Sequence, residues 1–224
     1  MSEKLWTAVD RYLADCLIAP DAVLEETLRV NAASGLPAID VTAHQGKFLY
    51  LLAVVQGARR ILEIGTLGGY STIWLARALP AEGMLVTLEA DAHHAKVAKA
   101  NIARAGLSEK VELRLAPALD SLEKMRGEGV AAFDFIFIDA DKANNPGYLE
   151  WAVRFSRPGT VIVVDNIVRD GKVIDAGSTD PAIRGTRRCI EMAGAHPRLE
   201  ATALQTVGGK GYDGFVLARV TGTP

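Results

Sequence analysis

Short apolar segments alternate with amphipathic helical segments along most of the sequence, and this alternation limits the possible folds more than any other feature. The segments that we expect to be strands are residues 60–64, 84–89, 111–115, 133–139 and 160–165. The helices expected between them are residues 70–79, 91–105, 118–126 and 146–155. Strands that are apolar throughout have to be covered on both faces, which is typical of a parallel sheet. The pattern therefore predicts an α/β fold with a doubly wound, mostly parallel sheet.

Helical patterns also precede the first strand, at residues 3–18, 21–33 and 43–56, and another follows the last parallel strand at residues 181–195. Two further strands, 199–205 and 214–220, are separated by the stretch GGKGYDG, which is typical of the loop of an antiparallel hairpin. The prediction is a seven-stranded sheet with a C-terminal antiparallel hairpin and N-terminal helices. No repeat or low-complexity tract divides the 224 residues, so we expect one domain, 1–224, with a helical extension at 1–35.

The composition argues against several classes of function. The formal net charge is −2, without a clustered excess of Lys and Arg, so nucleic acid is not an expected partner. No apolar run approaches the roughly 18 residues of a membrane span, and the acidic, amphipathic N-terminus does not resemble a secretory signal. Cys16 and Cys189 form no C-x-x-C pair. We therefore expect a cytoplasmic protein with two buried free thiols and no membrane partner.

The stretch ILEIGTLGGYS joins the first strand to its helix and contains three glycines. Glycine lets the backbone approach a ligand and adopt positive φ, and the helix start near Ser71 offers free N–H groups. Leu67 takes the second glycine position of G-x-G-x-x-G, so an ordinary tight turn is the alternative explanation. A second acid, Glu89, closes the next strand 24 positions after Gly65, where doubly wound folds hold ribose hydroxyls. Together these features predict a nucleoside ligand.

Glu63 favours one kind of nucleoside ligand over another. A dinucleotide would place its pyrophosphate at this turn, where a carboxylate about 4 Å away would cost on the order of 4 kcal/mol at an effective dielectric near 20. S-Adenosylmethionine (SAM) instead carries adenosine, ribose and a cationic amino-acid end, which a carboxylate attracts. The residues therefore favour SAM, and an NAD-dependent oxidoreductase is the alternative enzyme class.

The last two parallel strands both run into carboxylates. Asp139 ends the fourth strand in FDFIFIDADK, and Asp165 and Asn166 end the fifth in VIVVDNIV. Ligands of doubly wound sheets gather at the carboxyl ends of such strands, and neighbouring strands lie roughly 4.8 Å apart. Three oxygen ligands without His or Cys suit a hard cation such as Mg²⁺. A solvated strand end with an Asx turn is the alternative for any one of the three.

Five stretches of the chain strongly resemble the small, cation-dependent O-methyltransferases, which are relatives of catechol O-methyltransferase and of the caffeoyl-CoA type. They are VTAHQGKFLYLL, ILEIGTLGGYS, VTLEAD, FDFIFIDADK and VIVVDNIV, and the resemblance covers about residues 35–220 in the right order. The resemblance implies a Rossmann-like fold, SAM as methyl donor, and Mg²⁺ or a similar divalent cation. It also implies a homodimer formed through the N-terminal helices.

The resemblance assigns roles to individual residues. Asp139, Asp165 and Asn166 match the metal ligands, and Lys142 matches the catalytic base, with Asp139 counted among the catalytic residues as well. A nearby divalent cation disfavours the ammonium form of a lysine, as a base requires. Asp141 is expected to orient or balance Lys142. The cofactor-binding residues are expected to be Val41, Glu63, Gly65, Thr66, Ser71, Glu89, Ala118 and Asp139.

The residues and the resemblance together predict an enzyme that moves a methyl group from SAM to one hydroxyl of a small catechol-type (vicinal dihydroxy) aromatic. A non-catalytic module that only binds SAM is the alternative outside enzymes. Two departures from the family, Ile39 for methionine and Ala116 for glycine, leave the adenine contacts open. The segment NIVRDGKVIDAGSTDPAIRG, expected to cover the substrate, has no aromatic residue, so the acceptor is not named further.

Overall fold

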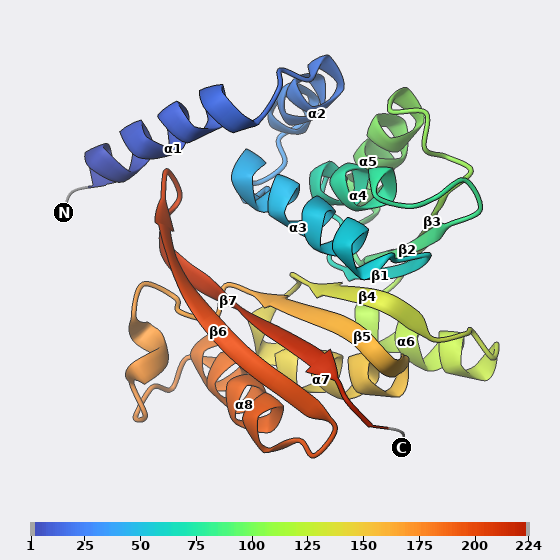
Figure 1. Ribbon diagram of the computed structural model, residues 1–224, viewed down its shortest axis with the longest axis vertical. Coiled ribbons are helices and arrows are strands. Elements are labelled where there is room, and N and C mark those ends of the chain that lie inside the picture. Colours follow the sequence, from blue (N-terminus) through green and yellow to red (C-terminus); the bar gives the residue numbers. More distant parts are fainter. Residues whose placement is uncertain (1–2, 223–224) are drawn as a thin grey trace. The chain divides into compact units, whose positions relative to one another are not determined.

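The computed structural model describes residues 3–222 and has the predicted α/β fold, with seven strands in a mostly parallel sheet and a C-terminal antiparallel hairpin (Figure 1). The chain divides into two compact units. One comprises residues 13–130, and the other comprises residues 131–224 together with residues 1–12. That the whole chain acts as one domain stays a prediction.

In the unit of residues 13–130, three parallel strands lie in the order β3-β2-β1. They are β1 (Arg60–Ile64), β2 (Met84–Glu89) and β3 (Val111–Leu115), which have the predicted boundaries. The helices are α2 (Ala22–Ala33), α3 (Ala43–Gln56), α4 (Tyr70–Arg77), α5 (Ala92–Arg104) and α6 (Ala118–Gly127). Helices α2, α3, α4 and α5 pack against one another, and α4 and α5 also contact the strands (Figure 1). The side chains of Ile61, Leu62 and Ile64 are completely buried, as expected for a strand covered on both faces.

Three of these helices begin at residues whose side chains accept hydrogen bonds from the first turn. Asp21 accepts from two backbone N–H groups of α2, Thr42 from one of α3, and Asp91 from two of α5. Such caps satisfy donors that have no partner inside a helix. Helix α3 ends at Gly57, whose φ of 65° is left-handed. These local signals explain why the predicted helices and the observed ones differ by only one or two residues.

In the unit of residues 131–224, four strands lie in the order β4-β5-β7-β6. Strands β4 (Phe133–Ile138) and β5 (Ser156–Asp165) are parallel, whereas β7 (Gly211–Val220) runs antiparallel to β5 and to β6 (Leu199–Gly208). The helices are α7 (Asn145–Arg154), α8 (Pro181–Ala195) and the short 3₁₀ helices η1 (Lys142–Asn144) and η2 (Lys172–Ile174). Helix α8 packs against α7, η1 and β6 (Figure 1). Phe133, Phe135 and Phe137 of β4 are completely buried.

Strand β5 begins at Ser156, earlier than the predicted start at residue 160. The early part pairs with β4 through an irregular register, in which Phe133 opposes Ser156 but Phe135 opposes Val161. Side chains hold this irregular part: Arg157 donates to Asp134, at 2.5 Å for the shorter bond, and the Thr160 hydroxyl donates to the Phe133 carbonyl at 2.6 Å. The contacts join residues far apart in the sequence, so the local pattern did not reveal them.

The hairpin is longer than predicted, because most of GGKGYDG belongs to the strands. The ladder runs to the pair Gly208–Gly211, which leaves a turn of only residues 209 and 210. The Asp10 side chain of α1 (Glu3–Leu17) accepts from the backbone N–H of Gly209 at 2.7 Å. A Cβ at Gly208 would lie 2.4 Å from an Asp10 oxygen, so a side chain there would displace the Asp10 carboxylate from its present position.

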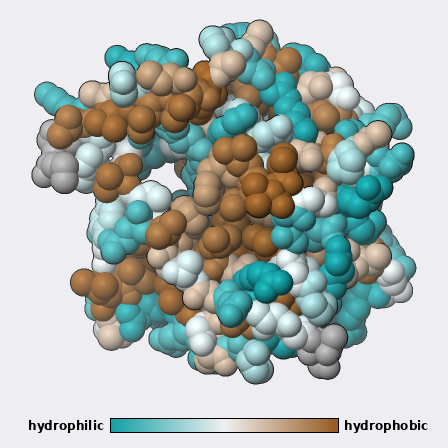
Figure 2. Space-filling view, viewed as in Figure 1, coloured by the Kyte–Doolittle hydropathy of each residue, from teal (hydrophilic) through white to brown (hydrophobic). Residues whose placement is uncertain are grey.

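Helix α1 has no buried residue among those that the structure describes. Its exposed apolar side chains include Leu5, Val9 and Leu17, and Figure 2 shows apolar side chains gathered along the helix. The predicted homodimer through the N-terminal helices stays a prediction, which sedimentation velocity can test. No helix in the range 3–222 is long and apolar enough to cross a membrane.

The prediction of two buried thiols is wrong for Cys16, which is exposed on α1, and correct for Cys189, which is buried in α8. Cys16 lies on a helix in which none of the described residues is buried. Burial raises the pKa of the Cys189 thiol to about 12, so that its reactive thiolate form is scarce near neutral pH.

We therefore expect one fast-reacting thiol in the native protein and two after denaturation. Titration with a chromogenic disulfide reagent at pH 8 checks this expectation. In the Cys16→Ser variant the fast phase should disappear, whereas Cys189→Ser should leave it unchanged. A fast phase of two equivalents in the folded wild type would contradict the burial of Cys189.

Candidate functional site

The turn between β1 and α4 has the backbone of a ligand-binding loop. Gly65 and Gly69 have φ of 104° and 85°, and Leu67 has φ of 50°, so three positions of the turn are left-handed. Position 68 favours glycine for a steric reason, because a Cβ there would lie 2.0 Å from the side-chain oxygen of Asn31 in α2. The short α4 therefore begins close to α2.

Glu63, near the end of β1, is completely buried and receives hydrogen bonds from three hydroxyl groups. Ser71 donates at 2.6 Å, Thr72 at 2.5 Å and Thr87 at 2.7 Å. An ionised carboxylate only accepts hydrogen bonds, and three hydroxyl donors match that requirement. Thr72 and Thr87 were not among the predicted site residues. Nothing in the local sequence pattern singles out Thr87, because the residues on both sides of it in β2 are buried as well.

The hydrogens of this network have fixed directions. A hydroxyl has one hydrogen, and Thr87 gives its hydrogen to Glu63, so the 2.6 Å contact between Thr66 and Thr87 requires Thr66 to donate. By the same argument, the oxygen of Ser71 has already given its hydrogen to Glu63 and can only accept from a further partner. A ligand group that meets Ser71 in this state has to be a donor, such as an ammonium. The Thr66 hydroxyl donates to Thr87, so its hydrogen is not available to a ligand, whereas the backbone of Thr66 takes no part in this contact.

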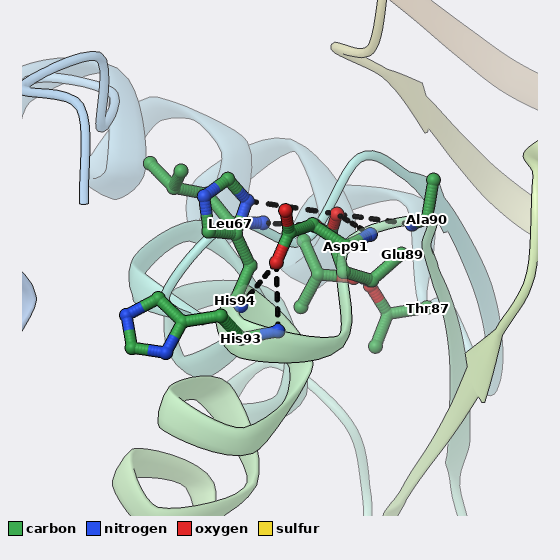
Figure 3. A network of polar contacts seen from close by, with 8 residues as sticks. Leu67, Thr87, Glu89, Ala90, Asp91, His93 and His94 are labelled. Atoms are coloured by element: carbon green, nitrogen blue, oxygen red, sulfur yellow. Dashed lines mark hydrogen bonds and ion pairs between the residues drawn. The ribbon is translucent and has the colours of Figure 1, made fainter.

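Glu89, the last residue of β2, ties the same turn to the start of α5 (Figure 3). One of its oxygens accepts from the N–H of Leu67 at 2.8 Å, and the other accepts from Ala90 and Asp91, both at 2.9 Å. His94 lies 3.7 Å from the second oxygen. A carboxylate has about four acceptor positions, so about one remains on the oxygen that Leu67 contacts. Glu89 thus both shapes the turn and keeps room for one hydroxyl donor.

Two buried asparagines hold the turn from the other side, and sequence reasoning missed both. Asn101 of α5 donates to the Gly68 carbonyl at 2.8 Å and to Asn31 at 2.9 Å. Asn31 donates in turn to Asp40 at 2.9 Å, next to the buried Val41 that was predicted to line the cofactor site. The network therefore connects the segment before α3 with the glycine turn.

Of the other predicted cofactor residues, Gly65 and Thr66 lie in the turn itself, and Ser71 lies in the first turn of α4. Ala118 is the first residue of α6. Nearby, the N–H of Ala116 donates to the Glu89 carbonyl at 3.0 Å, which brings the start of this segment to the end of β2. The structure thus joins Glu63 to Ser71 by a hydrogen bond and holds Glu89 against the same turn at Leu67, while Val41 and Ala118 come from adjoining segments.

In the unit of residues 131–224, Asp139 and Asp165 lie at equivalent positions at the carboxyl ends of two neighbouring strands. Ile138 of β4 is in register with Val164 of β5, so the next residue on each strand is a carboxylate. Parallel neighbours lie roughly 4.8 Å apart. Asp165 is nearly buried, and one of its oxygens accepts from the N–H of Asn166 at 2.8 Å. Asn166 has a left-handed φ of 55°, which turns the chain sharply after β5.

Lys142 pairs with Asp139. Its Nζ lies 2.6 Å from an Asp139 oxygen, and the two side chains are 9% and 20% exposed. Because Lys142 begins η1 only three residues after Asp139, the pair is formed within one short turn of chain. The ammonium is held near the end of β4, where the sequence predicted a base.

Asp141 does not pair with Lys142, which corrects the prediction. Its two oxygens accept from the Tyr148 hydroxyl at 2.5 Å and from the Asn144 amide at 2.7 Å. Burial and the hydrogen bond with Asp141 raise the pKa of Tyr148 well above its ordinary value, so this hydroxyl remains a donor. Asp141 therefore connects the loop to α7 and leaves Asp139 as the partner of Lys142.

Asp213 of β7 fixes the segment that carries Asn166, and it too was missed. One Asp213 oxygen accepts from the N–H groups of Val168, Arg169 and Gly214 at 2.9, 3.1 and 3.0 Å. Asp213 stabilises a segment in which Asn166, Arg169 and Asp170 all have left-handed φ. The Asp-Gly pair within a predicted hairpin loop gave no hint of this role.

The oxygens of Asp139, Asp165 and Asn166 form the donor set to be tested for a metal. Within residues 3–222 there is no group of three or more His, Cys, Asp or Glu side chains that could hold a metal. A cation here would therefore depend on two carboxylates and one amide oxygen. That set contains only hard oxygen donors, which fits Mg²⁺ with further positions left for water or substrate. The residues present fit a divalent cation of this kind.

A family model described as "O-methyltransferase" matches residues 17–220. The chain belongs to the O-methyltransferase family. The resemblance read from the sequence is thereby confirmed, and the protein is an O-methyltransferase. The roles of individual site residues stay predictions.

Known members of the family are similar over almost the whole chain. A catechol O-methyltransferase of Niastella koreensis is 52% identical, covering 98% of this chain and 100% of its own. A catechol O-methyltransferase of Mycobacterium tuberculosis is 51% identical, covering 95% and 94%. Among solved structures, an O-methyltransferase from Bacillus cereus in complex with SAH is 60% identical, with a TM-score of 0.97 over 98% of this chain and 100% of that one.

The three hydrogen bonds of Asp213 predict a test of the segment after β5. Asp213→Ala leaves three N–H groups without their acceptor and should lower the free energy of unfolding by about 1–3 kcal/mol. Asp213→Asn keeps a side-chain oxygen at the same position and should cost less. Urea unfolding of the two variants checks the order, and a fully stable alanine variant would show that Asp213 does not hold the segment.

Proposed function

We propose that this O-methyltransferase moves a methyl group from SAM to one hydroxyl of a small catechol-type aromatic, with the help of a divalent cation such as Mg²⁺. The observation that carries the proposal is the Asp139–Lys142 ion pair at the end of β4, beside a second carboxylate at the same level of β5. Two relatives with about half of their residues identical are named catechol O-methyltransferase. A similar structure contains SAH, which is what SAM becomes when it loses its methyl group.

The donor is proposed to bind at the β1–α4 turn. Glu89 accepts from a ribose hydroxyl on the oxygen that has an acceptor position left. Ser71, polarised by Glu63, accepts from the ammonium of the amino-acid end. Gly65 and Thr66 offer their backbone, and Val41 and Ala118 line the site from the adjoining segments. In this scheme Glu63 attracts the cationic donor through Ser71, because its own oxygens are occupied by hydroxyl groups.

The acceptor is proposed to react near Asp139 and Lys142. In its neutral amine form, Lys142 accepts the proton of one acceptor hydroxyl and becomes an ammonium, and the deprotonated oxygen then attacks the methyl carbon of SAM. The bond between carbon and sulfur breaks, its electron pair stays on sulfur, and SAH is left. Asp139 orients the lysine through their 2.6 Å contact. Bound to Asp139, Asp165 and Asn166, a divalent cation would supply Lewis-acid chemistry that makes a hydroxyl easier to deprotonate.

Two other functions fit the observations less well. An NAD-dependent oxidoreductase would not use the carboxylate of Glu63 at its pyrophosphate turn, and the family match favours methyl transfer. A module that only binds SAM has no need for a nearly buried lysine paired with a carboxylate. We therefore retain the catalytic proposal.

Glu89→Ala tests the donor site. We expect it to weaken SAM binding by about 1.5–3 kcal/mol, the range for hydrogen bonds to charged groups. Asp91→Ala is a matched control, since it removes the cap of α5 in the same network but no acceptor for ribose. Calorimetry should show the loss of affinity in the first variant and near wild-type affinity in the second. Equal affinities in a folded Glu89→Ala variant would refute the assignment.

Paired acceptors and metal removal test the reaction. A vicinal diol offers two oxygens to a cation in one orientation, whereas a lone phenol offers one. We expect a catechol to exceed its monohydroxy analogue by at least about 100-fold in kcat/KM at fixed Mg²⁺, which is roughly 2.7 kcal/mol. EDTA and Asp165→Ala should each abolish turnover while calorimetric SAM affinity stays nearly intact. Full-rate methylation by metal-free protein, or equal rates for the two acceptors, would refute the proposed role of the cation.

A further inference from the structure

Helix α8 has a glycine in its interior that its own conformation does not require. Gly185 is the fifth residue of PAIRGTRRCIEMAGA, and a glycine inside a helix destabilises it relative to alanine. Its φ is not left-handed among the described backbone angles. A contact with another element therefore has to explain the glycine.

That contact is with the backbone that carries Lys142. A Cβ on Gly185 would lie 2.3 Å from the Lys142 carbonyl oxygen, 2.8 Å from Ala143 Cα and 2.8 Å from the Ala143 carbonyl oxygen. Ordinary van der Waals contact begins at 3.4 Å. All three atoms belong to the main chain, so no side chain can rotate away to make room. Helix α8 can reach η1 this closely only with glycine at this position.

Packing, rather than side-chain hydrogen bonding, holds the two elements together. Thr186, next to Gly185, is completely buried, and its hydroxyl has no hydrogen-bond partner among residues 3–222. Asn145, directly after η1, is also completely buried, and neither polar atom of its amide has a partner in the described part of the chain. One turn further along α8, Cys189 is completely buried, and the charge of Lys142 acts on its thiol. Buried polar groups without partners reduce stability, so the close contact is retained at a cost.

The contact determines where the Lys142 side chain starts. Lys142 is the first residue of η1, and its Nζ makes a single 2.6 Å contact with Asp139. Restoring normal contact distances around a new Cβ would push the η1 backbone away by about 1 Å, and a misplacement of that size can reduce a rate by roughly 100-fold. From this geometry we infer that Gly185 is a positioning residue for Lys142: its missing side chain lets α8 hold η1 where the lysine meets Asp139. The inference rests on the proposed role of Lys142 as the base.

Gly185→Ala is the test, and the same helix offers a matched control. Gly194 also lies in α8, but a Cβ there would meet nothing within 4 Å, so Gly194→Ala makes the same chemical change without the collision. Lys142→Met tests the base itself. For each variant we would measure kcat and KM with a catechol, SAM affinity by calorimetry and the thermal midpoint. The reactivity of Cys189 in a Cys16→Ser background reports on the α8–η1 contact without any turnover.

The expected result is a split between rate and binding. Gly185→Ala should lose about 100-fold in kcat with SAM affinity nearly unchanged, and its Cys189 should react faster than in the parent. Gly194→Ala should match the wild type in all measurements. A folded Gly185→Ala variant with wild-type kcat would overturn the inference. So would a loss of activity that only follows the fraction of unfolded protein.

Two further outcomes keep the test decisive. If Gly185→Ala does not fold, Cys189→Val replaces it, because this change adds volume to the same face of α8, one helical turn beyond Gly185. A kcat that falls while SAM affinity holds supports the inference, and a wild-type kcat overturns it. Full activity in Lys142→Met would refute the base and with it the inference. An inactive Lys142→Met beside a fully active Gly185→Ala would leave the base in place and refute the positioning role alone.

Discussion

The buried carboxylate of Glu63 is the constraint on which the first half of the site depends. Removing a charge from water costs several kcal/mol unless the protein supplies hydrogen bonds. Here the donors are hydroxyls of Ser71 and Thr72 in α4 and of Thr87 in β2. The hydrogen bonds to Glu63 therefore hold the start of α4 against the ends of β1 and β2. The chain between β1 and α4 has to make a tight turn, with left-handed φ angles, to allow this. The site is shaped by the need to solvate a charge without water.

The position of the proposed base, Lys142, depends on a close approach between the backbones of α8 and η1. Gly65 and Gly69 are glycines because their φ is positive, but Gly68 and Gly185 have another reason. A side chain at Gly68 would strike the amide of Asn31, and one at Gly185 would strike the backbone of Lys142. Electrostatics thus positions the residues proposed to bind the donor, while steric contact positions the proposed base. The two kinds of constraint respond differently to substitution, which makes them separable by experiment.

Features that depend on the local sequence pattern were predicted correctly. Features that depend on contacts between residues far apart in the sequence were missed. Strands β1, β2 and β3 were predicted to the residue, because each is a bounded run of apolar or β-forming residues. The start of β5 was missed, because it is held by Arg157, which donates two hydrogen bonds to one oxygen of Asp134. Among site residues, the acids at the strand ends were visible from spacing. Thr87, Asn101 and Asp213 were not, since a threonine in a strand or an asparagine in a helix becomes informative only when its partner is known.

The carboxylates of the site differ in how many of their acceptor positions are filled by hydrogen bonds from the protein. Glu63 and Asp213 each receive three hydrogen bonds from the protein, and Asp141 receives two from neighbouring side chains. Glu89 also receives three but keeps about one of its four acceptor positions, which suits a ligand hydroxyl. Within residues 3–222, Asp139 accepts from Lys142 alone. A carboxylate that is one-fifth exposed and has a single partner keeps most of its acceptor positions for something the protein does not supply. Of these five carboxylates, Asp139 receives the fewest hydrogen bonds from the described protein, and it is the one that the proposed chemistry needs most.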